Sequence, residues 1–431
     1  MAEPETQRPA RLVTLRLPIW LTFGGLVGGL LGGSLIAGQP VADTILPVTA
    51  PVGALWLRAL QMTIIPLVAA LLVLGITQLA SAARAGATAR RMLVFVGGAL
   101  VLGGLATIIT MPLLLEAVPA PDGARGLLAA DVEPQEVPGI SDFILSLVAP
   151  NIIEAAADTA MLPLTIFFAL FAVAITRLSD EQSAMLRAFF EAVANAMLLV
   201  IGWVLWVAPV GVFALALGVA VRAGGDAAFL TLIHYILTVS AMGGIVLVVA
   251  FLVGAVRHGP VAFARAMLPA QAVAISTQSS LASLPAMLAS ARRLGISENV
   301  ADFVLPLSVA IFRATSPAMN LAVAIYVAHL FGIELGVTAL LAGLAVAFVI
   351  SIGSVSLPGS ISFVISIGPI ALAMGVPVEP LALLVAVEMI PDIMRTLANV
   401  TADVALASAT DRESGTSDAT DGDPARSMTD S

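Results

Sequence analysis

Long apolar runs recur along the chain and restrict its fold more than any other feature. Each is long enough to cross the ~30 Å hydrocarbon core of a bilayer as a helix, which needs about 20 residues. The runs lie near residues 17–38, 50–82, 92–117, 140–178, 184–221 and 227–256. Hydrophobic residues fill 59% of the 431 positions, far more than a soluble domain of this size tolerates. The sequence therefore predicts an all-α polytopic membrane protein.

The first run also allows a second interpretation. Three arginines, Arg8, Arg11 and Arg16, precede it and resemble the basic region of a cleaved signal peptide. The apolar part of a signal peptide has only about 7–15 residues, and this run is longer. We therefore predict a first membrane span that stays in the mature protein.

The residue types that support most enzymatic and metal chemistry are scarce. The chain has no cysteine, and its three histidines, His234, His258 and His329, lack the spacing of metal ligands. Because no nucleophile, metal cluster or phosphate-binding loop stands out either, we expect no enzyme activity, no cofactor and no firm metal site. A formal charge of −9 argues against nucleic acid as a partner.

Serine, proline and glycine interrupt the apolar pattern at two places after residue 260. The segments are residues 276–285 (Ser-Thr-Gln-Ser-Ser-Leu-Ala-Ser-Leu-Pro) and 351–360 (Ser-Ile-Gly-Ser-Val-Ser-Leu-Pro-Gly-Ser). Each is typical of a re-entrant hairpin, since irregular backbone at membrane depth is tolerated only where protein or water surrounds it. We expect a proline in the first turn of each returning helix, whose free N–H groups favour an anion. Paired interruptions point to a transporter site, and two ordinary kinked helices are the alternative.

Five polar side chains recur in the last apolar stretch at intervals of 4, 3, 4 and 4. They are Glu388, Asp392, Arg395, Asn399 and Asp403. At about 100° per residue they fall within an arc of roughly 80°, so one face of a single helix carries all of them. An ionised group at the bilayer centre costs on the order of 2.5–3.5 kcal/mol on insertion scales, so this face must turn away from lipid. The array is typical of a binding site for a charged, polar ligand.

Arginine alone sets the predicted orientation, because the chain has no lysine and basic loops stay cytoplasmic. Basic groups precede the first run, lie between the second and third and between the fourth and fifth, and surround the first interrupted segment. This pattern is consistent with cytoplasmic N- and C-termini. The acid-rich loop at residues 116–142 is expected outside, and the polar tail at residues 411–431 is expected to be disordered.

Three motifs resemble the dicarboxylate/amino acid:cation symporters, the family that includes the glutamate transporters. They are residues 208–215 (Ala-Pro-Val-Gly-Val-Phe-Ala-Leu), residues 305–307 (Leu-Pro-Leu) and, most specifically, residues 392–403 (Asp-Ile-Met-Arg-Thr-Leu-Ala-Asn-Val-Thr-Ala-Asp). The resemblance covers about residues 15–410. It implies eight transmembrane helices and two re-entrant hairpins, arranged as inverted repeats in an elevator-type carrier. It also implies a homotrimer surrounded by lipid in the plasma membrane, which is the inner membrane of a bacterium.

The same resemblance implies two domains. A scaffold domain that makes the trimer contacts would comprise residues 15–83 and 140–221. A mobile transport domain would comprise residues 90–117, 227–256 and 260–410, with hairpins near 260–291 and 336–375. Residues 1–14 and 411–431 would be cytoplasmic ends, and the second hairpin would act as the extracellular gate.

The resemblance also assigns binding residues one by one. Arg395 matches the arginine that grips a side-chain carboxylate, Asp392 the acid that holds the substrate's amino group, and Asn399 the amide that orients its main-chain end. Further contacts fall on the hairpin tips and the seventh helix: Ser279, Ser280, Ser316, Pro358 and Gly359. The pairing of Asp392 with Arg395 favours aspartate or glutamate over a plain dicarboxylate, because an unpaired buried carboxylate is costly.

One departure from the family pattern concerns the coupling ion. Sodium-coupled members carry Asn-Met-Asp-Gly-Thr in the seventh helix, and this chain has Phe-Arg-Ala-Thr-Ser at residues 312–316. Two cation ligands are absent, and a guanidinium close to a sodium site repels the ion. We therefore expect Arg313 to replace a bound cation in a site that includes Asp403 and Asn399. An Arg313 side chain that only extends to the membrane surface is the alternative.

Glu388 is a second candidate for coupling. The three acids and two arginines named above leave a formal charge of −1, which an anionic substrate deepens, and burial favours the neutral form of a carboxyl. Glu388 replaces a family aspartate and can also be a packing substitute. Asn320 stands where proton-carrying relatives have glutamate, so both proton and sodium stay open as the coupling ion.

These residues predict a secondary active carrier of acidic amino acids that works by proton coupling or exchange. Three alternatives stay open. They are a C4-dicarboxylate symporter with ordinary cation coupling, a substrate sensor without transport, and an anion-conducting relative.

Overall fold

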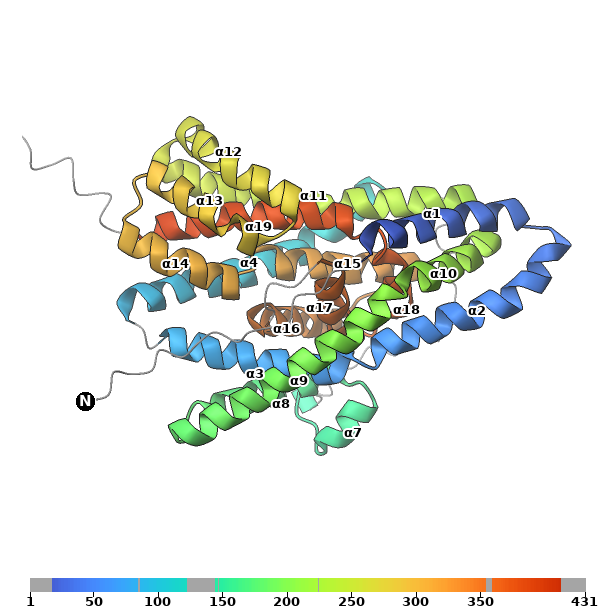
Figure 1. The fold of residues 1–431 in the computed structure, drawn as a ribbon, viewed down its shortest axis with the longest axis horizontal. Helices are drawn as coiled ribbons and strands as arrows, with labels where there is room; N and C mark the ends of the chain where they lie inside the picture. The colour runs from blue at the N-terminus through green and yellow to red at the C-terminus, as the bar shows by residue number, and fades with distance from the viewer. Residues whose placement is uncertain are drawn as a thin grey trace, which may run out of the picture.

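A computed structural model describes residues 18–83, 86–121, 144, 145, 147–223, 225–353 and 359–411, and in these ranges the chain is helical without β-strands (Figure 1). The N-terminal half contains α1 (Ile19–Ile36), α2 (Pro40–Gln61), α3 (Ile64–Ala83), α4 (Ala87–Ala117), α7 (Ile152–Ala157), α8 (Met161–Ile175), α9 (Asp180–Trp206) and α10 (Ala208–Ala223). The C-terminal half contains α11 (Gly225–His258), α12 (Pro260–Thr277), α13 (Ser280–Arg293), α14 (Glu298–Ile311), α15 (Thr315–Phe331), α16 (Val337–Gly353), α17 (Gly359–Ala373), α18 (Glu379–Leu384) and α19 (Met389–Thr410).

Several of these segments are long and apolar enough to cross a membrane. Within the described ranges there are five: Pro40–Ala83, Ala87–Ala117, Asp180–Trp206, Ala227–His258 and Glu298–Phe331. Shorter apolar helices lie at Trp20–Ile36, Met161–Ile175, Ala208–Arg222 and Val337–Ile352. The predicted all-α fold with several apolar membrane-length helices is confirmed.

Helix breaks interrupt three of the apolar runs. The runs at residues 50–82 and 184–221 each contain two helices, with breaks between α2 and α3 and between α9 and α10. Each break lies just before a proline in the first turn of the following helix, Pro66 or Pro209. Proline has no N–H to donate to the carbonyl four residues earlier, so the preceding helix ends there. The run at residues 140–178 is also interrupted, because α7 and α8 are separate helices.

α1 and α10 lie side by side (Figure 1) and pack closely against each other. Three glycines of α1 face three backbone carbonyls of α10. The pairs are Gly25 with Pro209, Gly29 with Phe213 and Gly33 with Leu217, and a Cβ added at each glycine would lie 2.3, 2.4 and 2.6 Å from the carbonyl oxygen. Small residues at this spacing let helix backbones approach closely where lipid offers no hydrophobic driving force. The two helices therefore form a close apolar pair that no larger side chain can enter without a shift.

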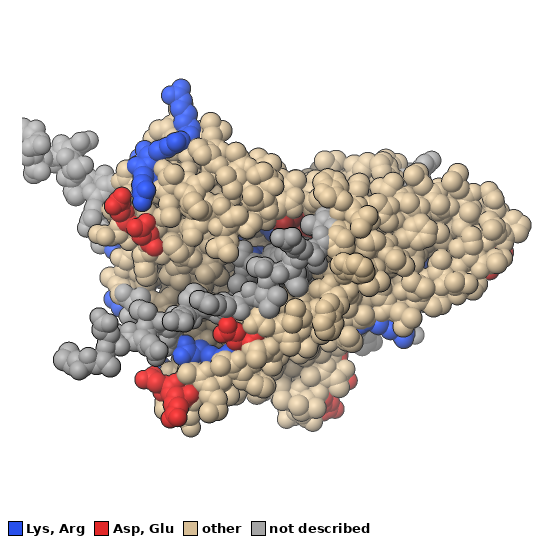
Figure 2. All heavy atoms as spheres, in the orientation of Figure 1, with Lys and Arg blue, Asp and Glu red and all other residues tan. Residues whose placement is uncertain are grey.

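Exposed charges are sparse on the face seen in Figure 2, and several of them lie over the end of the molecule formed by α12, α13 and α14. There Arg292 and Glu298 form an exposed ion pair, with 3.4 Å between Nε and Oε1. The visible surface over α1 and α10 is almost uncharged, and Trp20 and Leu35 of α1 are exposed. Such a broad uncharged surface is suited to contact with lipid or with another chain.

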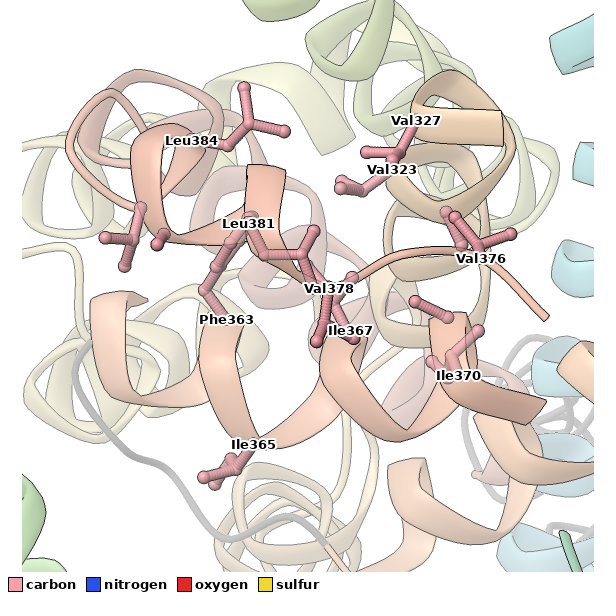
Figure 3. Packing of buried hydrophobic residues seen from close by; sticks show 14 of the residues in the cluster. Val323, Val327, Phe363, Ile365, Ile367, Ile370, Val376, Val378, Leu381 and Leu384 are labelled. Atoms are coloured by element: carbon pink, nitrogen blue, oxygen red, sulfur yellow. The ribbon is translucent and has the colours of Figure 1, made fainter. Parts of the chain in front are cut away.

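The largest cluster of buried apolar side chains among the described residues extends over many helices, and Figure 3 shows the part that joins α15, α17 and α18. It includes Val323 and Val327 of α15, Phe363 and Ile367 of α17, and Leu381 of α18. α15 is buried on every side, since 15 of its 17 residues are buried. Close packing therefore fixes the helix that carries part of the polar site described below.

The first interrupted segment separates two helices, α12 and α13, that pack against each other. Gln278 between them adopts a left-handed conformation with φ of 50°, and the Ser279 hydroxyl accepts a hydrogen bond from the N–H of Ala282 at 3.2 Å. Because this cap starts the helix at Ser280, Pro285 lies in the second turn of α13. The expectation of a proline in the first turn is therefore wrong for this hairpin.

The second interrupted segment separates α16 and α17, which also pack against each other. Its tip at residues 354–358, including Pro358, lies outside the described ranges, as do residues 1–17, most of the loop at 116–142 and the tail at 412–431. Gly359 is the first residue of α17.

Candidate functional site

The five polar residues predicted to share a face are all buried. Their exposed fractions are 1% for Glu388, 5% for Asp392, 5% for Arg395, 6% for Asn399 and 1% for Asp403. The face therefore turns into the protein, as its charge requires. The helix does not include all five, however, because α19 begins at Met389 and Glu388 is its N-cap residue. The chain from Val385 to Glu388 forms turns that separate α18 from α19.

Arg395 is the centre of the buried cluster. Its Nη1 donates to Oδ1 of Asn320 on α15 at 2.7 Å, and its Nη2 forms a hydrogen-bonded ion pair with Oε1 of Glu388. The third edge of the guanidinium faces Asp392, with 3.4 Å between Nε and Oδ1. That contact is an ion pair and not a hydrogen bond, since Nε has no hydrogen-bond partner among the described residues. The planar fork is thus surrounded by acceptors from three parts of the chain.

Tyr235, which the sequence analysis did not identify, binds the second carboxylate oxygen of Glu388. The hydroxyl of Tyr235, on α11, donates to Oε2 of Glu388 at 3.0 Å, and this side chain is fully buried. A signal was present, because the chain has only two tyrosines and both interrupt apolar helical runs. Both carboxylate oxygens of Glu388 are therefore occupied, one by Tyr235 and one by Arg395.

The start of α15 supplies a second group of polar contacts. The N–H and the hydroxyl of Thr315 both donate to Oδ1 of Asn399, each at 3.0 Å. The first N–H groups of a helix have no partner within the helix, so the Asn399 oxygen satisfies one of them. One turn later Nδ2 of Asn320 donates to the Ser316 hydroxyl at 3.1 Å. The structure thus brings Asn399, Ser316 and Arg395 together through Thr315 and Asn320.

Asp403, which follows Arg395 along α19, and Arg313 form the next part of the site. Arg313 is half-buried in the short non-helical segment between α14 and α15, and its charge acts on the carboxylates of both Asp392 and Asp403. Neither carboxylate oxygen of Asp403 has a hydrogen-bond partner in the described part of the chain. The Ser308 hydroxyl of α14 and the Arg313 guanidinium both act on this buried carboxyl, and Arg313 supplies the nearby positive charge.

The first hairpin approaches α19 but does not complete the site. α12 and α13 pack against α19, and Nε2 of Gln271 donates to the Thr401 hydroxyl at 3.1 Å. Ser279 and Ser280 are partly exposed at the start of α13, and within the described residues neither hydrogen-bonds to α19. Their predicted contact with a substrate carboxylate therefore stays a prediction, as do those of Pro358 and Gly359.

The arrangement is suited to carboxylate binding. No group of three or more histidine, aspartate or glutamate side chains that could hold a metal ion occurs among the described residues. The guanidinium of Arg395, in contrast, is buried and forms an ion pair with the carboxylate of Glu388. A ligand carboxylate can take the place of Glu388 on this fork if the Glu388 charge is neutralised, because two carboxylates cannot share it without repulsion.

Comparison with known proteins places the whole apolar region in one family. The model of the sodium:dicarboxylate symporter family matches residues 18–413. The proton/sodium-glutamate symport protein of Bacillus caldotenax is 27% identical over 396 residues, which cover 88% of this chain and 90% of that protein. The proton/glutamate-aspartate symporter of Escherichia coli (strain K12) is 26% identical, with 88% and 89% covered. Neutral amino acid transporter A of Bos taurus is also 26% identical, with 89% and 80% covered.

Proposed function

The chain belongs to the sodium:dicarboxylate symporter family, and from that premise we propose that it is a carrier of acidic amino acids such as aspartate or glutamate. Members of the family are secondary transporters and not enzymes, so this chain is a multi-pass membrane transporter. What we propose beyond this is the identity of the substrate. Two of the relatives carry glutamate or aspartate in their names, and a third is named for neutral amino acids.

The observation that carries the proposal is the buried fork of Arg395 beside Asp392. Arginine binds a carboxylate through two parallel hydrogen bonds, and Asp392 is close enough to bind an ammonium group on the same ligand. A substrate with both groups neutralises both residues. A plain dicarboxylate leaves Asp392 beside a second negative charge, which costs free energy in a buried site. An acidic amino acid therefore fits this pair better than succinate or malate does.

The proposal extends to the coupling ion. Arg313 acts on Asp403 and Asp392 from the break between α14 and α15, so a fixed guanidinium supplies charge that a bound cation supplies in sodium-coupled relatives. We expect the carrier to need no sodium and to use a proton gradient or exchange. Protonation of Glu388 is the step that frees Arg395 for substrate.

The proposal also covers the assembly. Eight membrane-crossing helices and two hairpins, α12–α13 and α16–α17, are expected to form a scaffold domain and a mobile transport domain within the bounds given above. What supports the division is that α1, α2 and α10 pack mainly with one another, while α11, α12 and α13 pack with α19. We expect a homotrimer in the bacterial inner membrane with both termini in the cytoplasm.

Uptake of labelled L-aspartate into proteoliposomes tests this function. With sodium and pH gradients imposed separately, we expect saturable uptake that an inward proton gradient or internal substrate drives, that glutamate inhibits and that sodium does not accelerate. Inhibition by succinate but not by glutamate would indicate a dicarboxylate carrier. Binding without flux would indicate a sensor, and substrate-gated anion current without uptake would indicate a conductive protein.

Arg313→Met tests the coupling part of the proposal separately. Loss of the fixed charge should make aspartate binding dependent on sodium, because Asp403 then lacks its compensating charge. The matched control is Arg293→Met, which removes an exposed arginine in the last turn of α13. If Arg313→Met binds aspartate without sodium and with undiminished affinity, the proposal that the Arg313 guanidinium replaces a bound cation is contradicted.

A further inference from the structure

A second buried polar cluster lies beside the Arg395 site and joins α4, α11 and α15, which pack against one another. Its centre is His234 of α11, which is 8% exposed. One ring nitrogen, Nε2, lies 2.8 Å from the backbone carbonyl oxygen of Val118 at the end of α4, and the other, Nδ1, lies 3.0 Å from the hydroxyl of Tyr326 on α15. The same hydroxyl lies 3.1 Å from the carbonyl oxygen of Thr231.

A count of protons shows what this cluster can do. It contains three short contacts, and each needs one proton between its two atoms. The outer atoms, the carbonyl oxygens of Val118 and Thr231, can only accept. A neutral imidazole and a phenol supply two protons for the three contacts, so one contact is left with two acceptors. A protonated imidazole supplies the third proton, and all three contacts then become hydrogen bonds.

The proton balance of the loading step is simple. In the neutral state Nε2–H donates to Val118 and the Tyr326 hydroxyl donates to Nδ1. When a proton from water binds Nδ1, the hydroxyl proton rotates toward the Thr231 carbonyl and the hydroxyl oxygen accepts from Nδ1–H. No other bond forms or breaks.

The cluster is connected to the substrate site through neighbouring tyrosines. Tyr235 follows His234 in the chain and donates to Glu388, and its ring meets that of Tyr326 edge to face with 5.4 Å between centroids. The helices packed around His234 carry few other ionisable groups. On α11 these are Asp226, Arg257 and His258; on α15, His329; on α4, Arg90, Arg91 and Glu116; on α10, Arg222; on α12, Arg265; on α19 with its cap, Glu388, Asp392, Arg395 and Asp403; and α1 has none.

The end of the cluster at Val118 lies near the surface. Val118 is 49% exposed and ends the helix from which the long loop toward α7 departs. The Nε2 atom of His234 thus contacts the backbone of a residue that is itself partly exposed. An imidazolium there would also bring the formal charge of the substrate site, −1 from three acids and two arginines, to zero before an anionic substrate arrives.

We propose that His234 and Tyr326 form a proton-binding site of this carrier, loaded from the side on which α4 ends and filled together with substrate. The role in coupling rests on the proposed function, whereas the proton site itself does not. Tyr326 is a positioning residue that accepts from the charged ring, and His234 is the group that holds the proton.

The proton site is tested without transport by nitrogen NMR of the full-length protein labelled at histidine in lipid vesicles. His234→Gln assigns the signal, with His258→Gln as the matched control. We expect the His234 ring to carry protons on both nitrogens at low pH, and on Nε2 alone at high pH. A ring that stays neutral down to pH 5 would overturn the proposal.

Coupling is tested by aspartate-driven proton uptake in proteoliposomes. His234→Gln should lower the number of protons per aspartate by about one, and His258→Gln should leave it unchanged. Tyr326→Phe should move the pH midpoint of uptake down by about one unit, since a hydrogen bond to a charged ring is lost. An unchanged ratio and midpoint in these variants would overturn the coupling role. A wild-type protein that carries no aspartate would count against the proposed function, and the NMR result would still decide the proton site.

Discussion

The contact between α1 and α10 and the contact between α15 and α19 both hold two helices together, but with opposite kinds of residues. In the first, glycines remove side chains until backbone meets backbone, and no charge is present. In the second, buried charges and amides are retained, and they pair with Asn320 and Thr315 of α15 or within α19 and its cap. The first contact offers no polar group to a ligand or proton, whereas the second contains charged and amide groups that can bind one. We therefore expect ligand binding in the second region and an unchanging helix contact in the first.

The largest effect on aspartate binding is expected for a substitution in the contact between α15 and α19. Arg395→Met should weaken aspartate binding by roughly 30-fold to several thousand-fold, because truncating one partner of a buried charge pair costs about 2–5 kcal/mol. Isothermal titration of the purified protein measures this loss.

Two further variants make that result decisive. Arg292→Met removes an arginine from an exposed ion pair and should leave affinity unchanged. Arg395→Lys keeps the charge and loses the fork, so a folded protein with at least about tenfold weaker binding is expected. Wild-type affinity in Arg395→Met would remove this residue from the site.

In the contact between α1 and α10, a single added methyl group should lower the stability of the protein. Gly29→Ala places a Cβ 2.4 Å from the Phe213 carbonyl oxygen and 2.8 Å from the Ala216 Cβ, so the helices must separate. We expect a loss of about 1–3 kcal/mol in the free energy of unfolding. A lower thermal midpoint with unchanged aspartate affinity is the expected measurement.

Gly24→Ala is the matched control in the same helix. A Cβ there meets no atom within 4 Å, so stability should be kept or slightly raised by the better helix propensity of alanine. If both substitutions lower the thermal midpoint equally, close backbone approach is not what holds α1 to α10.

Glu388→Gln should remove a pH dependence and not the fold. When one proton is taken up with each substrate, the dissociation constant falls about tenfold for each unit of decreasing pH. The sign follows from the geometry, since protonation of Glu388 releases Arg395 and so favours substrate. In Glu388→Gln the amide cannot ionise, so the pH dependence of affinity should lose the proton that Glu388 takes up, and the dependence that remains is that of His234.

The control for this titration is Glu379→Gln, an exposed glutamate in the first turn of α18. Its affinity should follow the wild-type pH profile. A Glu388→Gln protein that keeps the full pH dependence would place the coupled proton on another group.

The smallest effect is expected for Thr315→Val. It removes one of two hydrogen bonds to the Asn399 oxygen and keeps the other, from the backbone N–H. A net cost of about 0.5–1.5 kcal/mol corresponds to roughly 2- to 10-fold weaker binding in titration calorimetry. Thr49→Val removes a hydroxyl that, among the described residues, hydrogen-bonds within its own helix to the Ile45 carbonyl, and this variant should bind as the wild type does.

Local periodicity explains what the sequence could predict. The spacing from Asp392 to Asp403 identified one buried face because helix geometry is set by neighbouring residues. Apolar run length likewise predicted the helical membrane class. Helix breaks were less visible, since Pro66 and Pro209 lie in runs whose hydropathy is uninterrupted.

Partners distant in the chain could not be derived in the same way. Asn320 binds Arg395 across 75 residues, and Tyr235 binds Glu388 across 153. No spacing encodes such pairs, because they depend on how α11 and α15 pack against α19. A buried charge still predicts that a partner exists, and a tyrosine in an apolar helix indicates where to look.

The most direct measurement is an electron cryomicroscopy structure of the full chain in lipid, with and without L-aspartate. We expect the ligand's side-chain carboxylate on the fork of Arg395, its ammonium group on Asp392, and Glu388 displaced from Nη2. Aspartate bound elsewhere while Arg395 keeps its contact with Glu388 would contradict the exchange of carboxylates on which the proposed transport depends.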